Sequence, residues 1–161
     1  MFKKYNWQQP IYKNDLITVI IFGLTAAILG GFLSGLIDSF LYKYGINISF
    51  SLLINSLLIG FAVRRAYANY HVLYPTLSLG FYFIALFFTF VARNVGLIGI
   101  QNLGFILTQP ESYYLFFTQP FIVFINVFKA FDFLYFVLAI LNIVFIVLGF
   151  VSVYKLSKRL N

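Results

Sequence analysis

Polar side chains that could do chemistry lie inside long apolar runs of this sequence, at Asp38, Asn55 and Asn142. A carboxylate or an amide inside such a run needs water or a hydrogen-bonding partner, so it marks either a contact between helices or a polar cavity. We expect Asn55 to hydrogen-bond across helices, with Asn142 as a candidate partner. Asp38 lies near one end of its run, where we expect it to be solvated or paired with Lys43 or Arg93. The alternative is a proton or substrate site.

Other groups with catalytic potential are few and scattered. The chain has no cysteine and one histidine, His71, which has no second histidine and no nearby acid with which to share a metal. A glycine-rich phosphate loop, an H-E-x-x-H motif and paired carboxylates on one helix face are all missing from the sequence. We therefore expect no enzymatic activity, no cofactor and no metal.

Small residues recur at every fourth position of the first apolar run, at Gly23, Ala27, Gly31 and Gly35. Positions i and i+4 share a helix face, so these four residues form a smooth strip, here called the small-residue stripe, which another backbone can approach closely. We expect it to pack within the chain against the second or fourth helix, or against a different membrane protein. In this it is similar to the first helix of the substrate-binding subunits of energy-coupling-factor vitamin transporters, which docks a partner through small residues.

The elements that must position these residues are membrane helices. Hydrophobic residues make up 62% of the 161-residue chain and charged residues 9%, whereas soluble domains are typically about 45–50% apolar and about 25% charged. A helix needs about 20 apolar residues to cross a bilayer, and four runs provide them. We predict one polytopic all-α membrane domain over residues 1–161, with transmembrane helices at about 16–41, 46–63, 72–92 and 133–154.

The segment 94–128, between the third and fourth of these helices, is apolar but interrupted by glycines, by Glu111 and by Pro120. Its halves, 94–110 and 112–128, are each about 17 residues long, the lower limit for crossing a membrane. Proline also disfavours the helical conformation in the residue before it. We predict short interfacial helices on the outer side. The alternative is a hairpin of two crossings, which would make six transmembrane helices.

Basic residues predict how the chain is oriented in the membrane. The formal net charge is +7, but the Lys and Arg residues cluster at the ends of apolar runs, which indicates membrane orientation rather than nucleic-acid binding. Cytoplasmic loops carry an excess of Lys and Arg, and with the N-terminus inside, eight of the 11 basic residues lie there. We predict a multi-pass protein of the bacterial cytoplasmic (inner) membrane with both termini cytoplasmic. The eight residues are Lys3, Lys4, Lys13, Arg64, Arg65, Lys155, Lys158 and Arg159, and the last five are the expected topology anchors.

Two segments place basic residues at the end of an apolar helix. They are Gly60-Phe61-Ala62-Val63-Arg64-Arg65-Ala66, where a glycine-containing helix ends in basic residues, and the closing stretch 148–156, which ends aromatic-basic. Both resemble segments of small uncharacterised bacterial four-helix integral membrane proteins. The zinc-binding ribbon carried by many such proteins is missing, because the chain has no cysteine. The resemblance implies a four-helix topology and no particular activity.

These patterns support two hypotheses about function. The first is a non-enzymatic accessory or assembly subunit of a larger membrane complex, with the lipid bilayer and other membrane-protein subunits as its partners. It rests on the small-residue stripe and on the outer apolar segment 94–128, whose apolar side chains are difficult to cover in an isolated four-helix protein. The alternative is a small transporter or solute-binding membrane component, in which Asp38, Asn55 and Arg93 face a cavity connected to the outer side.

Overall fold

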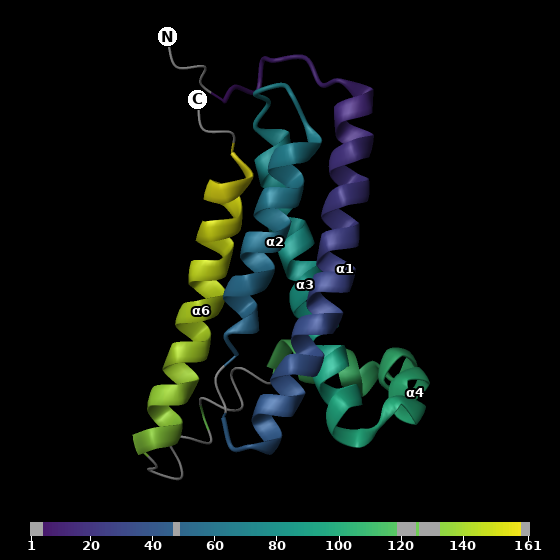
Figure 1. Cartoon of the computed structure of the whole chain (residues 1–161), viewed down its shortest axis with the longest axis vertical. Coiled ribbons are helices and arrows are strands. Elements are labelled where there is room, and N and C mark those ends of the chain that lie inside the picture. Colours follow the sequence, from purple (N-terminus) through teal and green to yellow (C-terminus); the bar gives the residue numbers. More distant parts are fainter. Residues whose placement is uncertain (1–4, 47–48, 119–124, 126–132, 159–161) are drawn as a thin grey trace.

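A computed structural model describes residues 5–46, 49–118, 125 and 133–158, and within these ranges the chain is helical and contains no strand. Four helices run side by side along the long axis of the molecule (Figure 1). The predicted all-α class is therefore confirmed. The four are α1 (Lys13–Lys43), α2 (Ser51–Ala66), α3 (Leu73–Ile98) and α6 (Phe133–Ser157).

Three of the helices are long and apolar enough to cross a membrane. They are Lys13–Lys43 with 31 residues, Leu73–Ile98 with 26, and Phe136–Ser157 with 22. At 1.5 Å per residue even the shortest measures about 33 Å, against about 30 Å for the hydrocarbon core. The fourth, α2, has only 16 residues, which corresponds to about 24 Å. Of the four spanning helices that we expected, three therefore have a spanning length in the structure.

Helix bounds differ from the expected ones mainly at the ends of the runs. α2 begins at Ser51 instead of about residue 46, because the chain between α1 and α2 first turns through Gly45, whose φ is +80°. α3 continues to Ile98 instead of about residue 92. It ends at Gly99, where φ is +97° and the backbone N–H bonds to the Val95 carbonyl oxygen over 2.8 Å. Glycine adopts a positive φ at least cost, so the helix can end at this residue without strain.

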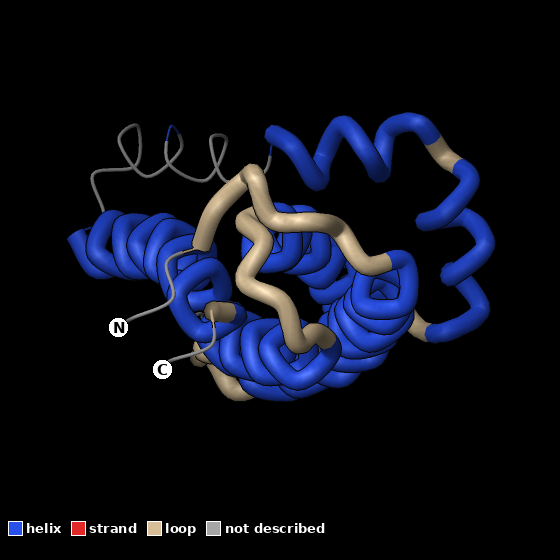
Figure 2. Tube along the Cα trace, turned by 90° about the horizontal axis from the view of Figure 1, so that it is seen from above, coloured by secondary structure: helices blue, strands red, loops and turns tan. Residues whose placement is uncertain are grey.

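Short helices follow α3 at the end of the bundle opposite Tyr5 and Ser157. They are a 3₁₀ turn, Ile100–Asn102, then α4, Leu103–Thr108, and then the helical residues 110–118. They lie beside the bundle, as Figure 2 shows in a view along its axis. Since α4 has six residues, residues 94–110 form no crossing, so the first arm of the six-helix alternative does not occur. The second arm, 112–128, is described only in part, because 119–124 and 126–128 lie outside the described residues.

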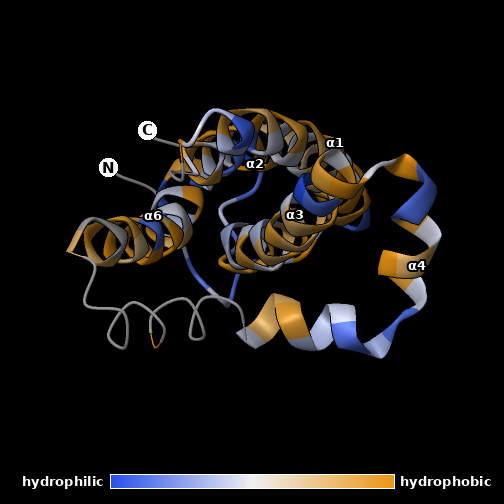
Figure 3. Ribbon diagram, turned by 90° about the horizontal axis from the view of Figure 1, so that it is seen from below, coloured by the Kyte–Doolittle hydropathy of each residue, from blue (hydrophilic) through white to orange (hydrophobic). Residues whose placement is uncertain are grey.

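The outer surface of the bundle is strongly apolar. Leu29 is 59% exposed, Leu33 62% and Val147 56%, and hydrophobic residues surround α1, α3 and α6 (Figure 3). Large apolar side chains exposed along helices of spanning length are most simply covered by lipid. The described residues therefore fold as a bundle suited to a membrane.

Both described ends of the chain meet at one end of the bundle. The Tyr5 and Tyr67 hydroxyl oxygens are 2.6 Å apart, and the Tyr67 hydroxyl also contacts the Ser157 carbonyl oxygen at 2.5 Å. Tyr67 directly follows α2, close to the basic pair Arg64 and Arg65. The N-terminal segment, the α2–α3 loop and the end of α6 therefore lie at the same end of the bundle.

Candidate functional site

The small-residue stripe is buried against α3. All four of its residues are buried. A Cβ atom at Gly31 would lie 2.6 Å from the Ala85 carbonyl oxygen, and one at Gly35 would collide with the Thr89 carbonyl oxygen. The stripe therefore packs within the chain, but against the third helix; the expected second or fourth helix was wrong. With α3 seated on it, the stripe offers no surface to another protein.

A second row of α1, one residue earlier in each turn, faces α2. A Cβ at Gly30 would lie 3.2 Å from the Asn55 Oδ1 atom. One turn further, the Ser34 hydroxyl donates to the same oxygen over 2.9 Å. After another turn, the Ser51 hydroxyl donates to Asp38 Oδ2 over 2.6 Å. α1 thus lies in the groove between α2 and α3, with the small-residue stripe against α3 and the second row against α2.

Asn55 ties three helices together. Its side chain is fully buried, and besides accepting from Ser34 its Nδ2 donates to Thr89 Oγ1 over 3.0 Å. The expected interhelical hydrogen bonds are present, but the suggested partner is wrong. Asn142 Oδ1 instead accepts the backbone N–H of Ser49 over 3.1 Å. The two actual partners are short hydroxyl side chains, and nothing in their sequence context distinguishes them from other Ser and Thr residues.

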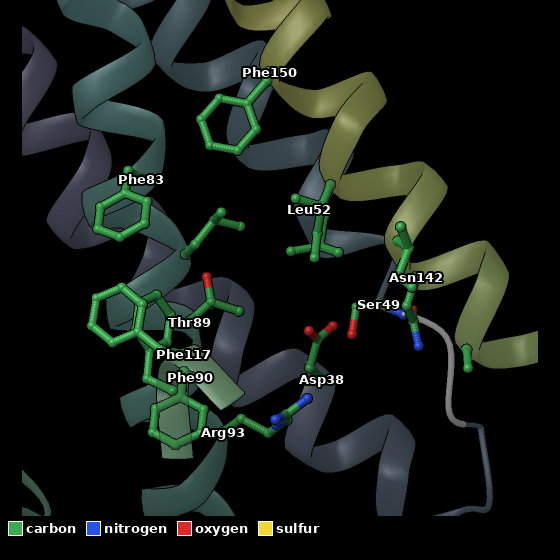
Figure 4. A pocket seen from close by; sticks show the side chains of 15 residues that line it. Asp38, Ser49, Leu52, Phe83, Thr89, Phe90, Arg93, Phe117, Asn142 and Phe150 are labelled. Carbon is green, nitrogen blue, oxygen red and sulfur yellow. Dashed lines mark hydrogen bonds between the residues drawn. The ribbon is translucent and has the colours of Figure 1, made fainter. Parts of the chain in front are cut away.

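A pocket of about 340 Å³ opens between the helices at the end opposite Tyr5 and Ser157. Figure 4 shows Asp38 of α1, Arg93 of α3 and Asn142 of α6 around it. Asn55, which the transporter alternative placed at such a cavity, does not line this one. Its lining consists of Asp38, Ser49, Leu52, Phe83, Leu86, Thr89, Phe90, Arg93, Phe116, Phe117, Ala139, Asn142, Ile143, Ile146 and Phe150.

The polar side of the pocket centres on one carboxylate. Asp38 is 5% exposed, and its Oδ2 accepts from Ser51. Its Oδ1 has no hydrogen-bond partner among the described residues. Arg93 extends its guanidinium toward Asp38 in Figure 4, and these are the two charged side chains in the described lining. Their formal charges cancel, so the described part of the lining is neutral while keeping one buried acceptor unsatisfied.

With the midpoint of α1 placed at the centre of a bilayer, Asp38 would lie at the edge of the hydrocarbon core. It is ten residues from the midpoint of α1, which is about 15 Å along the axis. Half of a hydrocarbon core is also about 15 Å thick. A carboxylate at that boundary costs much less than one at the centre, so a charged Asp38 is compatible with a membrane-spanning α1.

The apolar side of the pocket is largely aromatic and includes the helical residues 110–118. The Phe116 ring packs edge-on against Phe90, with 5.6 Å between centroids, and against Phe83 at 5.8 Å. Phe117 stacks on Phe83 at 6.0 Å. Sequence reasoning missed this pair as pocket residues. The signal was the density of aromatic residues in 105–117, five of thirteen, within a segment that we treated as an interfacial connection.

At the opposite end, His71 serves as a link between loops. It is 3% exposed, its Nδ1 accepts the Leu73 N–H over 3.0 Å, and its Nε2 lies 3.2 Å from the Trp7 carbonyl oxygen. These contacts join the N-terminal segment to the start of α3. No group of three or more His, Cys, Asp and Glu side chains that could hold a metal occurs in the described ranges.

The expected topology anchors lie at this same end as far as they are described. Arg64, Arg65 and Lys155 occupy the last turns of α2 and α6. The Lys158 ammonium lies 4.2 Å from the centroid of the Tyr154 ring, a cation–π contact. Arg159 lies outside the described residues.

Fold and pocket together define the class: a helical bundle with helices long enough to cross a membrane and an amphipathic pocket toward one end. Comparison with protein-family models, curated proteins and solved structures found no match. The resemblance to bacterial four-helix membrane proteins therefore stays a prediction, and the function has to be argued from the site.

Proposed function

We propose that this chain is a non-enzymatic protein of the bacterial inner membrane that binds a small solute in the pocket at Asp38 and Arg93. The observation that carries the proposal is a pocket of about 340 Å³ holding a buried carboxylate oxygen without a partner among the described residues. Ligand sites are typically concave and mostly apolar, with a few polar groups that orient the ligand. The pocket has this composition.

The same geometry weakens the competing proposal of an accessory or assembly subunit. That proposal relied on the small-residue stripe, which α3 covers, and on the outer apolar segment. The described part of that segment packs on α3 through Phe116. The stripe is thus accounted for within the chain, and the described part of the segment is accounted for in part, whereas the pocket is not.

The proposed topology has four crossings, with α2 as the shortest. α2 packs against α1, α3 and α6, so its flanks are covered by protein. A bilayer can thin locally around a short helix at a modest cost. By the positive-inside rule, the end with Arg64, Arg65 and Lys155 is cytoplasmic, and the pocket then lies toward the outer face. α4 and residues 110–118 would rest in the outer interface, where the exposed Glu111 stays hydrated.

The test is to identify what copurifies with the protein in mild detergent. Ala139→Trp would fill the pocket, because Ala139 is 6% exposed and lines it. Val147→Trp is the matched control on the same helix, since Val147 is 56% exposed and faces outward. Solvent extraction and mass spectrometry should find a small molecule with the wild type and with Val147→Trp, and at least tenfold less with Ala139→Trp.

Two results would overturn the proposal. One is the absence of any small molecule from the wild type together with a stoichiometric protein partner, which would favour the accessory-subunit function. The other is equal retention of the small molecule by Ala139→Trp and Val147→Trp, which would place its binding elsewhere.

A further inference from the structure

We infer that the ligand is an uncharged, ring-containing, mainly apolar molecule with one hydroxyl or N–H group, which donates a hydrogen bond to Asp38 Oδ1. This inference rests on the proposed solute-binding function and specifies its ligand class. Three properties of the pocket carry it: the unsatisfied acceptor, the balance of charge and the aromatic wall.

The acceptor determines the polar group of the ligand. Asp38 is 95% buried, since its exposed fraction is 5%, and a buried carboxylate oxygen without a donor keeps an uncompensated desolvation cost. Ser51 already donates to Oδ2, so the remaining acceptor is Oδ1, which has no partner in the described part of the chain. A ligand O–H or N–H would supply that bond. An ether or carbonyl oxygen would instead bring its lone pairs against the carboxylate.

The charge balance determines the net charge of the ligand. Arg93 points toward Asp38 from α3 (Figure 4), and the described lining contains no other charged side chain. A cationic ligand would leave one positive charge uncompensated in a low-dielectric environment, and an anionic ligand would leave one negative charge. A neutral donor satisfies Oδ1 and leaves the balance unchanged.

The aromatic wall of the pocket determines the apolar part of the ligand. Of the fifteen lining residues, ten are apolar and five of these are phenylalanines. Flat rings stack well on such a wall. The volume of about 340 Å³ is at the lower end of the range of about 300–1,000 Å³ for ligand sites. One or two fused rings with a short polar arm fit these dimensions.

The experiment uses four probes that share a naphthalene body. They are naphthalen-2-ylmethanol, its methyl ether, naphthalen-2-ylmethylamine and 2-naphthoate, which present a neutral donor, no donor, a cation and an anion. Affinities are measured by isothermal titration calorimetry on the full-length protein in detergent. We expect the alcohol to bind at least tenfold more tightly than the ether, and more tightly than either charged probe.

Asp38→Asn tests whether Oδ1 is the acceptor. The amide keeps the size of the side chain, and its single oxygen can still accept from Ser51, so its NH₂ group faces the pocket. The tenfold preference for the alcohol over the ether should then fall to within about twofold. Asp15→Asn is the matched control: Asp15 lies in the first turn of α1, at the opposite end of the bundle, so this variant should keep the wild-type preference.

Tighter or equal binding of the ether, the amine or the carboxylate by the wild type would overturn the inference and leave solute binding intact. An unchanged preference in Asp38→Asn would also overturn it. If that variant does not fold, the four wild-type affinities decide alone. Failure of every probe, with no small molecule copurifying, would instead remove the proposed function itself.

The same chemistry could belong to a solute from the outer water or to an apolar alcohol or amide from the bilayer. A repeat titration after addition of a lipid extract from the native membrane separates the two sources. Competition with the alcohol probe would identify a bilayer molecule as the occupant, and undiminished binding would identify a solute from water. Either result supports the inferred ligand chemistry.

Discussion

Replacing Gly31 by alanine tests whether close backbone approach of α1 and α3 holds the bundle together. The added Cβ would lie 2.6 Å from the Ala85 carbonyl oxygen and 3.0 Å from the Phe88 Cβ. Two of the three nearest atoms belong to the α3 backbone, so neither can rotate away and the helices must separate. Overpacking of this kind costs about 1–3 kcal/mol.

Gly80→Ala is the matched control, because it makes the same chemical change on α3. Nothing lies within 4 Å of a Cβ atom at Gly80. Gly80→Ala therefore changes only the helix propensity. Alanine is the best helix former, so the change stabilises a helix by up to about 1 kcal/mol. Gly31→Ala gains the same helix propensity, so the two variants should differ by the overpacking cost alone, about 1–3 kcal/mol, with Gly31→Ala the less stable.

Thermal unfolding in mild detergent, followed as loss of the monomer peak in size-exclusion chromatography, measures this difference. For a chain of this size each kcal/mol shifts the midpoint by roughly 2–4 °C, so Gly31→Ala should melt several degrees below Gly80→Ala. Gly31→Leu should be worse still, whereas Leu33→Ile, at a side chain 62% exposed, should resemble the wild type. Equal midpoints for Gly31→Ala and Gly80→Ala would refute the packing of the stripe against α3.

The remaining predictions concern topology and buried hydrogen bonds. Ala68→Cys, at an exposed position of the α2–α3 loop, should resist a membrane-impermeant thiol reagent in intact cells, whereas Glu111→Cys should react. Asn55→Ala removes hydrogen bonds to α1 and α3 and should cost about 1–2 kcal/mol, since such bonds in membranes average about 0.6 kcal/mol each and reach about 1.7. Tyr67→Phe removes the hydroxyl that contacts Tyr5 and Ser157; it should lower the free energy of unfolding by about 1–2 kcal/mol without changing affinity in the distant pocket.

Each of these predictions has a contradicting outcome. Labelling of Ala68→Cys before lysis would reverse the orientation, and protection of Glu111→Cys until the membrane is permeabilised would place residue 111 on the inner side. Asn55→Ala with wild-type stability would mean that the buried amide contributes nothing to helix association. A change in probe affinity in Tyr67→Phe, with the fold intact, would show coupling between the two ends of the bundle.

The choice of test positions shows what the structure adds to the sequence. By sequence alone, Ser157 is a suitable position for a topology cysteine, since it lies among Lys155, Lys158 and Arg159. In the structure it is fully buried, and its hydroxyl lies 3.1 Å from that of Ser78. A cysteine there would be unreactive whichever side it faced. Ala68 avoids this ambiguity because its side chain is exposed.

The sequence by itself determined the apolar helices and the packing face of the first of them. Length and composition decide whether a helix can cross a bilayer, which is why α1, α3 and α6 were found from their uncharged runs. Four-residue spacing places Gly23, Ala27, Gly31 and Gly35 on one face whatever lies opposite. The interruption of 94–110 likewise argued against a crossing, and the six-residue α4 agrees with it.

Only the tertiary structure decided which faces meet. In a bilayer the lipid tails are as apolar as the side chains, so association depends on close packing and on individual hydrogen bonds, and several pairings of smooth apolar helices look equivalent in sequence. The choice among these pairings decides which helix covers the stripe and which side chains bond to Asn55. It also decides that Asp38 and Phe116 line the same pocket. These contacts span 34 residues between Asn55 and Thr89 and more between Asp38 and Phe116, and no local pattern along the chain records them.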